Sequence, residues 1–372
     1  MTKPPIIKLN VFFFIFTFVV AAFVVPYRAF TTGFDSTEIL FAFACFCYCG
    51  LSITAGYHRL WSHKTYQAHA IVRFIFALGG AFSFQNSILH WSSDHRVHHK
   101  HVDNNDKDPY SAKMGFWYSH IGWMCRHYQA HEYHDYTNVR DLQKDAIVMW
   151  QHKYYVLLSF GMNLGVPIAF GLWHGDVINS LLLAGFLRLV LSQHTTFFIN
   201  SLAHVWGKQT YTDKNTARDN GFLALFTFGE GYHNYHHIFE NDYRNGIRWF
   251  DYDPTKWLIK SCYYLGLAQK LRKSPEDKIE KAKLAMTLKR TKEKLIVLPN
   301  TEKTIMHLQN EYDLLIKKLN DFYQIRKALL QAKGEQVMQE VESSELRAQY
   351  LEIKKTLIAQ QRNWHLMTAK LA

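Results

Sequence analysis

The order of apolar and polar positions along the chain predicts four membrane-spanning helices. About 20 apolar residues in a helix cross a hydrocarbon layer about 30 Å thick. Four runs approach that length, and they cover residues 9–25, 39–55, 154–173 and 178 to about 199. Pro26 is expected to end the first run, and the turn His174-Gly175-Asp176 joins the last two. The pattern therefore predicts an all-α integral membrane protein.

A fifth apolar stretch, residues 70–89, is not expected to cross the membrane. It is interrupted by a charge, two glycines and a polar triplet, at Arg73, Gly79, Gly80 and Gln85-Asn86-Ser87. We predict a helix buried against the spans or lying at the interface. Residues 90–152 are polar and rich in histidine and aspartate, and we expect them to contribute to a helical cap on one face of the spans.

The positions of lysine and arginine predict the orientation of the chain. Cytoplasmic loops carry an excess of these residues. The amino terminus and the regions after the second and fourth spans contain them, whereas the turn 174–176 contains none. Both termini, the cap and every histidine cluster are therefore expected on the cytoplasmic side of a multi-pass membrane protein.

The chain after about residue 270 has a different character. It is charged, and its apolar residues recur in steps of four and three, at Leu308, Tyr312, Leu315, Leu319, Phe322 and Leu329. This spacing predicts amphipathic helices. We divide the chain into a transmembrane and cytoplasmic domain, 1–267, and a basic helical extension, 268–372.

Charge and cysteine usage narrow the class of protein. The net charge is +12, and residues 268–372, with 21 Lys+Arg and 13 Asp+Glu, supply +8 of it. A basic segment beside membrane spans fits attraction to anionic lipid headgroups, so we expect the lipid bilayer as a partner and no nucleic acid. Three of the five cysteines lie inside the second apolar run, where thiols behave as small hydrophobes. This excludes a disulfide-stapled secreted protein.

Three histidine clusters predict the chemistry. In 95–99, HRVHH, the histidines occupy positions i, i+3 and i+4, which share a helix face, although i+3 and i+4 diverge by about 100°. The same spacing recurs in a second cluster, and a looser pair precedes both; the eight residues are His58, His63, His95, His98, His99, His233, His236 and His237. Because neighbouring histidines that diverge can each serve a different ion, we predict a polynuclear metal site.

The ligand type alone leaves the metal open among Fe, Zn, Cu and Ni. Structural zinc usually closes with four ligands that often include cysteine, and these clusters contain none. A site with two metal ions, each bound by several nitrogens and open on one side, suits oxygen activation better than a structural role. Most other histidines are expected at the surface or the interface, among them His69, His101, His120, His127, His131, His134 and His152.

The clusters and a fourth motif resemble those of a known family. HRLWSH (58–63), HRVHH (95–99) and GEGYHNYHH (229–237), together with NSLAH (200–204), are similar to the histidine boxes of the membrane fatty acyl desaturases. The resemblance is greatest to the Δ9 acyl-CoA, or stearoyl-CoA, desaturase branch. It covers about residues 34–257 and leaves out roughly the last hundred.

The resemblance implies a di-iron centre held by nine histidines. One iron would be bound by His58, His63, His95, His99 and His237. The other would be bound by His98, His204, His233 and His236, with Asn200 reaching it through a water. Asn200 and His204 are four residues apart, which places both on one face of a continuous helix.

The resemblance also implies a bent substrate tunnel, lined by Gln85, Asn86, Trp91, Thr196 and Phe197. Phe197 departs from the family pattern, in which tryptophan is expected. Metal-binding imidazoles usually donate the N–H of their second ring nitrogen to an acceptor that fixes the orientation of the ring. Our candidates for groups that orient the imidazoles in this way are Asp94, Glu230 and Asn234.

The implied reaction is the O₂-dependent insertion of a cis double bond, at Δ9, into a saturated long-chain acyl group. The acyl carrier is CoA, a carrier protein or a lipid, with CoA preferred; Arg140, Lys144 and Lys153 are candidates to bind its phosphates. We find no haem or flavin motif, so an external electron donor is expected, a ferredoxin or a cytochrome b5-like protein with its reductase. The alternatives are a membrane di-iron hydroxylase or alkane monooxygenase, and a non-enzymatic membrane scaffold that acts through the C-terminal helices.

Overall fold

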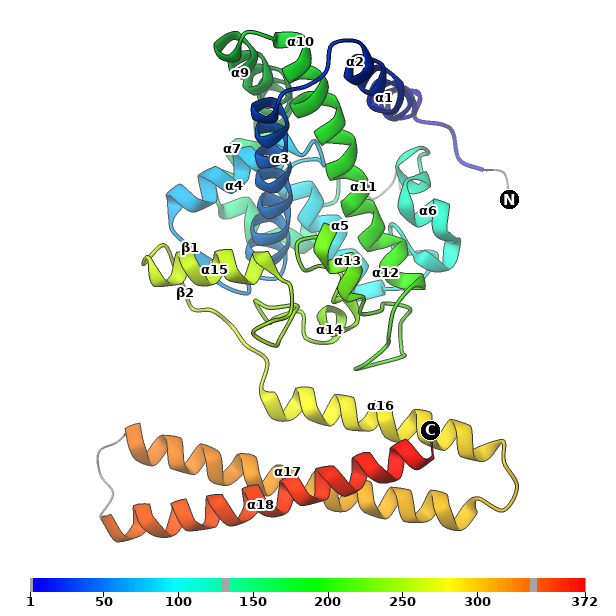
Figure 1. Cartoon of the computed structure of the whole chain (residues 1–372), viewed down its shortest axis with the longest axis vertical. Coiled ribbons are helices and arrows are strands. Elements are labelled where there is room, and N and C mark those ends of the chain that lie inside the picture. The colour runs from blue at the N-terminus through cyan, green and yellow to red at the C-terminus, as the bar shows by residue number, and fades with distance from the viewer. Residues whose placement is uncertain (1–2, 129–133, 335–339, 372) are drawn as a thin grey trace. The chain divides into compact units, whose positions relative to one another are not determined.

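A computed structural model of the chain describes residues 3–128, 134–334 and 340–371, which are mostly helical (Figure 1). The chain divides into two compact units, Met1–Gln209 with Lys214–Lys273, and Thr210–Asp213 with Ser274–Ala372. The first contains the apolar helices and the histidine clusters. The second is the C-terminal helical unit.

The prediction of four spans is confirmed. Within the described residues, four helices are long and apolar enough to cross a membrane: Lys8–Thr31, Ser36–Ser62, Tyr155–His174 and Val177–Val205. They consist of α1 (Lys8–Val19), η1 (Val20–Val24) and α2 (Val25–Thr31); α3 (Ser36–Leu51) and η2 (Ser52–Ser62); α8 (Tyr155–Phe160), η7 (Gly161–Gly165) and α9 (Val166–His174); and α10 (Val177–Ser180), η8 (Leu181–Leu187), α11 (Arg188–Asn200) and α12 (Leu202–Val205).

The sequence predicted that the first span ends at Pro26, and this prediction is wrong. The wider π-helical turn η1 precedes the proline, which occupies the first turn of α2, and the helix continues to Thr31. Within a continuous α-helix, proline would remove a backbone hydrogen bond and its ring would clash with the carbonyl four residues earlier. A π-turn inside an α-helix thus lets the span run past the proline.

Shorter elements complete the first unit. They are the helices α4 (Ala70–Phe82), α5 (Ile88–His101), α6 (Phe116–His120), α7 (Ala146–Lys153), α13 (Gly221–Phe226), α14 (His233–Ile238) and α15 (Pro254–Tyr264), the 3₁₀ turns η3 (Ala112–Met114), η4 (Gly122–Met124), η5 (Thr137–Val139) and η6 (Leu142–Lys144), and the strands β1 (Gln67–Ala68) and β2 (Ala268–Gln269). The strands pair antiparallel. α4 is apolar but shorter than a span, in agreement with the prediction that residues 70–89 do not cross the membrane.

Close packing of α4 on η2 fixes the segment that leads into the second histidine cluster. A Cβ atom added at Gly80 would lie 2.0 Å from a ring carbon of Tyr57, so only glycine allows this approach. The Tyr57 hydroxyl donates to the carbonyl of Asn86 (3.2 Å) and accepts from the Gln151 side chain (2.7 Å). This ties the loop after α4 to η2 immediately before α5 begins.

Among its described residues, the second unit contains three helices: α16 (Glu276–Ile296), α17 (Glu302–Gly334) and α18 (Glu340–Lys370). Successive helices of the unit run antiparallel (Figure 1). Its buried core consists of Leu288, Leu295, Leu308, Leu315, Leu319, Leu357 and Trp364. Leu308, Leu315 and Leu319 of the predicted stripe are at most 1% exposed, so the 4,3 pattern identified the inner face of α17.

Candidate metal centre

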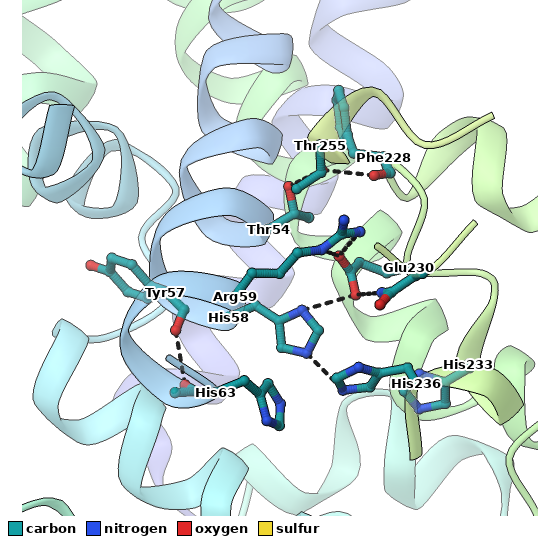
Figure 2. Close-up of polar contacts among 12 residues, drawn as sticks. Thr54, Tyr57, His58, Arg59, His63, Phe228, Glu230, His233, His236 and Thr255 are labelled. Carbon is teal, nitrogen blue, oxygen red and sulfur yellow. Dashed lines mark hydrogen bonds and ion pairs between the residues drawn. The ribbon is translucent and has the colours of Figure 1, made fainter. Parts of the chain in front are cut away.

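Nine histidines from four segments meet in the first unit, and all are largely buried. The π-helical element η2 supplies His58, and His63 follows directly after it. The His63 amide donates to the His58 carbonyl five residues earlier, at 3.1 Å. Rings five residues apart would point in different directions on an α-helix, whereas the wider π turn brings them to one side. His58 and His63 are drawn in Figure 2.

The histidines form two groups of candidate ligands, and the ligand atoms in each lie within 4.8 Å of one another. The first group contains His58, His63, His95, His99 and His236, and the second contains His98, His204, His233 and His237. In the first group, His236 Nε2 lies 2.9 Å from His58 Nε2 and 3.0 Å from His99 Nε2. In the second, His233 Nε2 lies 3.1 Å from His204 Nε2 and 3.0 Å from His237 Nε2.

The predicted placement of His236 and His237 is reversed in the structure. His236 belongs with the group of five and His237 with the group of four. On α14, His233 and His237 are four residues apart and therefore differ by about 40° in direction, whereas His236 and His237 differ by about 100°. The same rule already placed His95 and His99 together on α5, apart from His98.

Acceptors outside the groups fix the orientation of the rings. The Nδ1 atom of His58 lies 2.9 Å from Glu230, that of His98 lies 2.8 Å from Asp108, and that of His99 lies 3.2 Å from Glu240. Because ionised carboxylates only accept, these Nδ1 atoms donate, and the lone pair of each ring is left on Nε2. The Nε2 atoms are those that face one another inside the groups.

Of the residues predicted to orient the imidazoles, Glu230 contacts a candidate ligand. Asp94 lies 3.4 Å from Nε2 of His90, a histidine outside both groups, and the Asn234 amide donates to the Ala217 carbonyl at 2.9 Å. The sequence did not reveal Asp108 and Glu240, nor Thr216, whose hydroxyl lies 2.8 Å from His204 Nδ1. All three lie in loops, where no periodicity indicates which side chain meets which ring.

A buried ion-pair network holds the Glu230 carboxylate in place beside His58. The carboxylate accepts from the guanidinium of Arg59 at 2.8 Å (Figure 2). Arg59, which is 1% exposed, also pairs with Asp253 at 3.0 Å. Burial acts to raise the pKa of Glu230, but the neighbouring His58 and Arg59 outweigh it, so the pKa is lowered. Glu230 therefore remains an acceptor for His58.

The environment keeps the imidazoles neutral. Burial lowers the pKa of His95 well below its usual value, and neighbouring histidines lower it further. Burial also lowers the pKa of His99 to about 4, although its hydrogen bond to Glu240 opposes the shift. Neutral imidazole is the form that binds metals.

The spacing of the nitrogens fits bound metal ions. Two imidazole nitrogens held 2.0–2.1 Å from one ion lie about 3 Å apart when the angle at the ion is near 90°. The closest Nε2 pairs within the two groups are 2.8–3.3 Å apart. Facing lone pairs at this separation repel unless a cation or a proton lies between them, so two adjacent metal ions suit this donor set.

The helical argument that linked Asn200 to His204 is not supported. α11 ends at Asn200, and α12, which carries His204, begins at Leu202 after a break at Ser201. His204 still reaches the second group. Water-mediated binding by Asn200 stays a prediction.

Three of the five predicted tunnel residues, Gln85, Trp91 and Thr196, contact a histidine of the metal groups or one another. The ring of Trp91 stacks on His95 with 4.8 Å between centroids, and the Gln85 amide donates to the Thr196 hydroxyl at 2.9 Å. The backbone of Asn86, next to Gln85, accepts from Tyr57. Phe197 is buried and lies edge-on to His120 and Phe14, at 5.7 and 6.1 Å. Their role in binding substrate stays a prediction.

His120 was expected at the surface or the interface, but it is 2% exposed. Its Nδ1 lies 2.9 Å from the Ser201 hydroxyl, and its Nε2 lies 3.0 Å from His194 Nδ1. Hydrogen bonds between α6 and the fourth span thus account for its burial. His131 lies outside the described residues.

Replacing Asp108 with alanine should weaken metal binding by about 10- to 100-fold, because His98 loses the acceptor that fixes its ring. The comparison is Asp106→Ala, since Asp106 lies in the same loop but is exposed. Metal retained against a graded series of chelator concentrations gives the affinity. Equal retention by the two variants would show that Asp108 does not support the site.

Comparisons with known proteins agree with this geometry. A family model described as fatty acid desaturase matches residues 37–271. The "Probable acyl-CoA desaturase" of Schizosaccharomyces pombe is 46% identical over 256 residues, which cover 68% of this chain and 53% of that protein. The human "Stearoyl-CoA desaturase 5" is 38% identical over 249 residues, which cover 66% of this chain and 75% of that protein. The "sn-2 palmitoyl-lipid 9-desaturase" of a Nostoc species is 36% identical over 240 residues, which cover 63% of this chain and 81% of that protein.

The aligned region spans about half the length of the Schizosaccharomyces pombe relative. The family model covers well over half of this chain and includes all nine histidines of the two groups. The chain belongs to the fatty acid desaturase family.

Proposed function

We propose that the chain is an O₂-dependent acyl-CoA desaturase that holds two iron ions and inserts a cis double bond at Δ9. The observation that carries this proposal is the pair of adjacent groups of five and four imidazoles. Membership of the desaturase family and the names of the relatives, which include acyl-CoA desaturases and a 9-desaturase, support it.

The proposed ligands follow the structural groups. His58, His63, His95, His99 and His236 would hold one iron, and His98, His204, His233 and His237 the other, with Asn200 reaching the second through a water. Bound iron supplies the activation of O₂. The carboxylates at Nδ1 of His58, His98 and His99 would keep these three rings in the tautomer whose Nε2 faces the ion.

The remaining task of the protein is to position the acyl chain and to exclude water. Trp91, stacked on His95, places an apolar wall next to the first group of histidines. The hydrogen bond between Gln85 and Thr196 joins the loop after α4 to α11. We propose that the acyl chain passes between these elements, so that one C–C bond lies beside the ions.

The stoichiometry requires an electron donor. Removal of two hydrogens from the acyl chain, with O₂, two electrons and two protons, gives the alkene and two waters. We propose that a ferredoxin or a cytochrome b5-like protein with its reductase supplies the electrons. The Lys/Arg distribution supports docking on the cytoplasmic side, where both termini and the site would lie.

The acyl carrier is proposed to be CoA. Arg140, Lys144 and Lys153 are exposed cations near α7, available to pair with phosphates. The Schizosaccharomyces pombe and human relatives are named for CoA thioesters, whereas the Nostoc relative is named for a palmitoyl lipid. The two substrate forms can be tested separately.

Purified chain in nanodiscs, given O₂ and reduced cytochrome b5, is expected to convert labelled stearoyl-CoA to the cis-Δ9 product. Stearoyl phosphatidylcholine in the disc should remain saturated. Gas chromatography with mass spectrometry identifies the product and the bond position. Hydroxylated acyl chains without alkene would show a hydroxylase, desaturated phospholipid would reassign the carrier, and the absence of any oxidised product would favour the scaffold alternative.

A further inference from the structure

The outward face of α18, in the C-terminal unit, has a pattern that the metal site does not use. Leu351, Ile358 and Leu366 are 63%, 55% and 54% exposed. Their spacing of seven and eight residues places them along one side of the helix. Large aliphatic side chains exposed in a line on a folded unit indicate a surface that something covers.

Four cations share this side of the helix. At 100° per residue, Arg347 and Lys354 fall on one side of Leu351 and Ile358, and Lys355 and Arg362 fall on the other, so that the apolar and basic residues share an arc of about 120°. Glu352 is the only acidic residue between Arg347 and Lys370, and it falls outside the arc. Leu366 lies about 60° from Leu351, beyond Lys355 and Arg362. Aliphatic and basic residues therefore interleave across the face, with cations on both sides of Leu351 and Ile358.

These four cations have no partner among the residues that the structure describes: their side chains make no hydrogen bond or ion pair there. Elsewhere in the unit, Lys281 pairs with Asp277, Lys283 with Glu280, and Arg326 with Glu276. The exposed face of α18 thus lacks the counter-charges that α16 and α17 provide.

The opposite side of α18 is already occupied. Leu357 and Trp364 are 5% and 2% exposed and belong to the core shared with α16 and α17. The helix cannot rotate to bury its outward face without losing this core. A ligand for that face must come from outside the unit.

We propose that this face of α18 lies on a membrane surface that contains anionic lipids. The aliphatic line would enter the boundary between headgroups and acyl chains, and the long lysine and arginine stems would carry their charges outward to the headgroups on both sides. Anionic headgroups supply the missing counter-charge. The four spans of the same chain keep the C-terminal unit near a bilayer, which raises the effective concentration for this contact.

Hydrogen–deuterium exchange of residues 345–370 in the full chain tests the proposal. The chain is placed in nanodiscs of phosphatidylcholine alone or with about 30% phosphatidylserine. Exchange is expected to be several-fold slower in the anionic discs. Equal rates in the two discs would overturn the proposal.

Three double variants, one of them a control, separate the contribution of charge from that of insertion. Lys354→Glu with Lys355→Glu should abolish the protection by phosphatidylserine, whereas Lys303→Glu with Lys327→Glu, an equal charge change at exposed positions of α17, should leave it. Leu351→Ser with Ile358→Ser should also abolish the protection by phosphatidylserine. Full protection in this variant would overturn the claim that the aliphatic side chains insert into the membrane. Exchange in neutral discs equal to that of the unsubstituted chain shows that each variant is folded.

An acidic protein is the competing ligand for a basic face. Poly-glutamate is therefore added to the chain in neutral nanodiscs as an acidic polypeptide probe. On our proposal it gives less protection than phosphatidylserine does. Protection by poly-glutamate, with none from phosphatidylserine, would overturn the membrane assignment in favour of an acidic partner.

Discussion

The His98→Ala variant is expected to lose desaturation by more than about 100-fold, beyond the usual loss for a residue that only orients a ligand, and to carry less iron than the unsubstituted chain. His98 Nε2 lies 3.3 Å from His237 Nε2, and its Nδ1 is held by Asp108. Its removal leaves three histidines in the second group. Product formation and iron content measured on the same sample test both expectations.

His101→Ala is the matched control for this variant. His101 lies at the end of the same helix, α5, and belongs to neither group. It should retain normal turnover and iron content. Full iron and full turnover in His98→Ala would refute the assignment of His98 as a ligand.

Two double variants are expected to differ sharply in iron retention, because the structure groups His98 with His237 and not with His236. His98→Ala with His237→Ala removes two ligands from the group of four and leaves the group of five complete. One iron should then resist a chelator as strongly as in the unsubstituted chain. His98→Ala with His236→Ala removes one ligand from each group. In this variant no iron should resist the chelator as strongly as in the unsubstituted chain.

Iron that remains after a timed chelator challenge gives the comparison. The opposite order, with one resistant iron only in the variant that lacks His98 and His236, would restore the grouping expected from the sequence. Both double variants are expected to be inactive, so the distinction depends on metal retention and not on turnover.

The spans and the histidine clusters could be predicted from the sequence because both are local patterns: the spans are long apolar runs, and the histidines have a helical spacing. Runs of about 20 apolar residues identify spans regardless of how they pack. The spacing of His95, His98 and His99 identifies which rings diverge on α5. The same rule, that histidines four residues apart on a helix point in nearly the same direction, would have grouped His233 with His237 on α14.

Other features depended on contacts that the sequence does not encode locally. Asp108 and Glu240 reach His98 and His99 through irregular loops, and the alignment of His58 with His63 depends on a π-helical turn. The burial of His120 follows from hydrogen bonds to Ser201 and His194, about 75 to 80 residues away. These are tertiary effects, and a pattern along one segment cannot show them.

Metal analysis combined with Mössbauer spectroscopy of the purified, active chain tests the central claim most directly. The account predicts two irons per chain in two distinct environments, which correspond to the groups of five and four histidines. An active sample with a single iron per chain, or with another metal in place of iron, would contradict it.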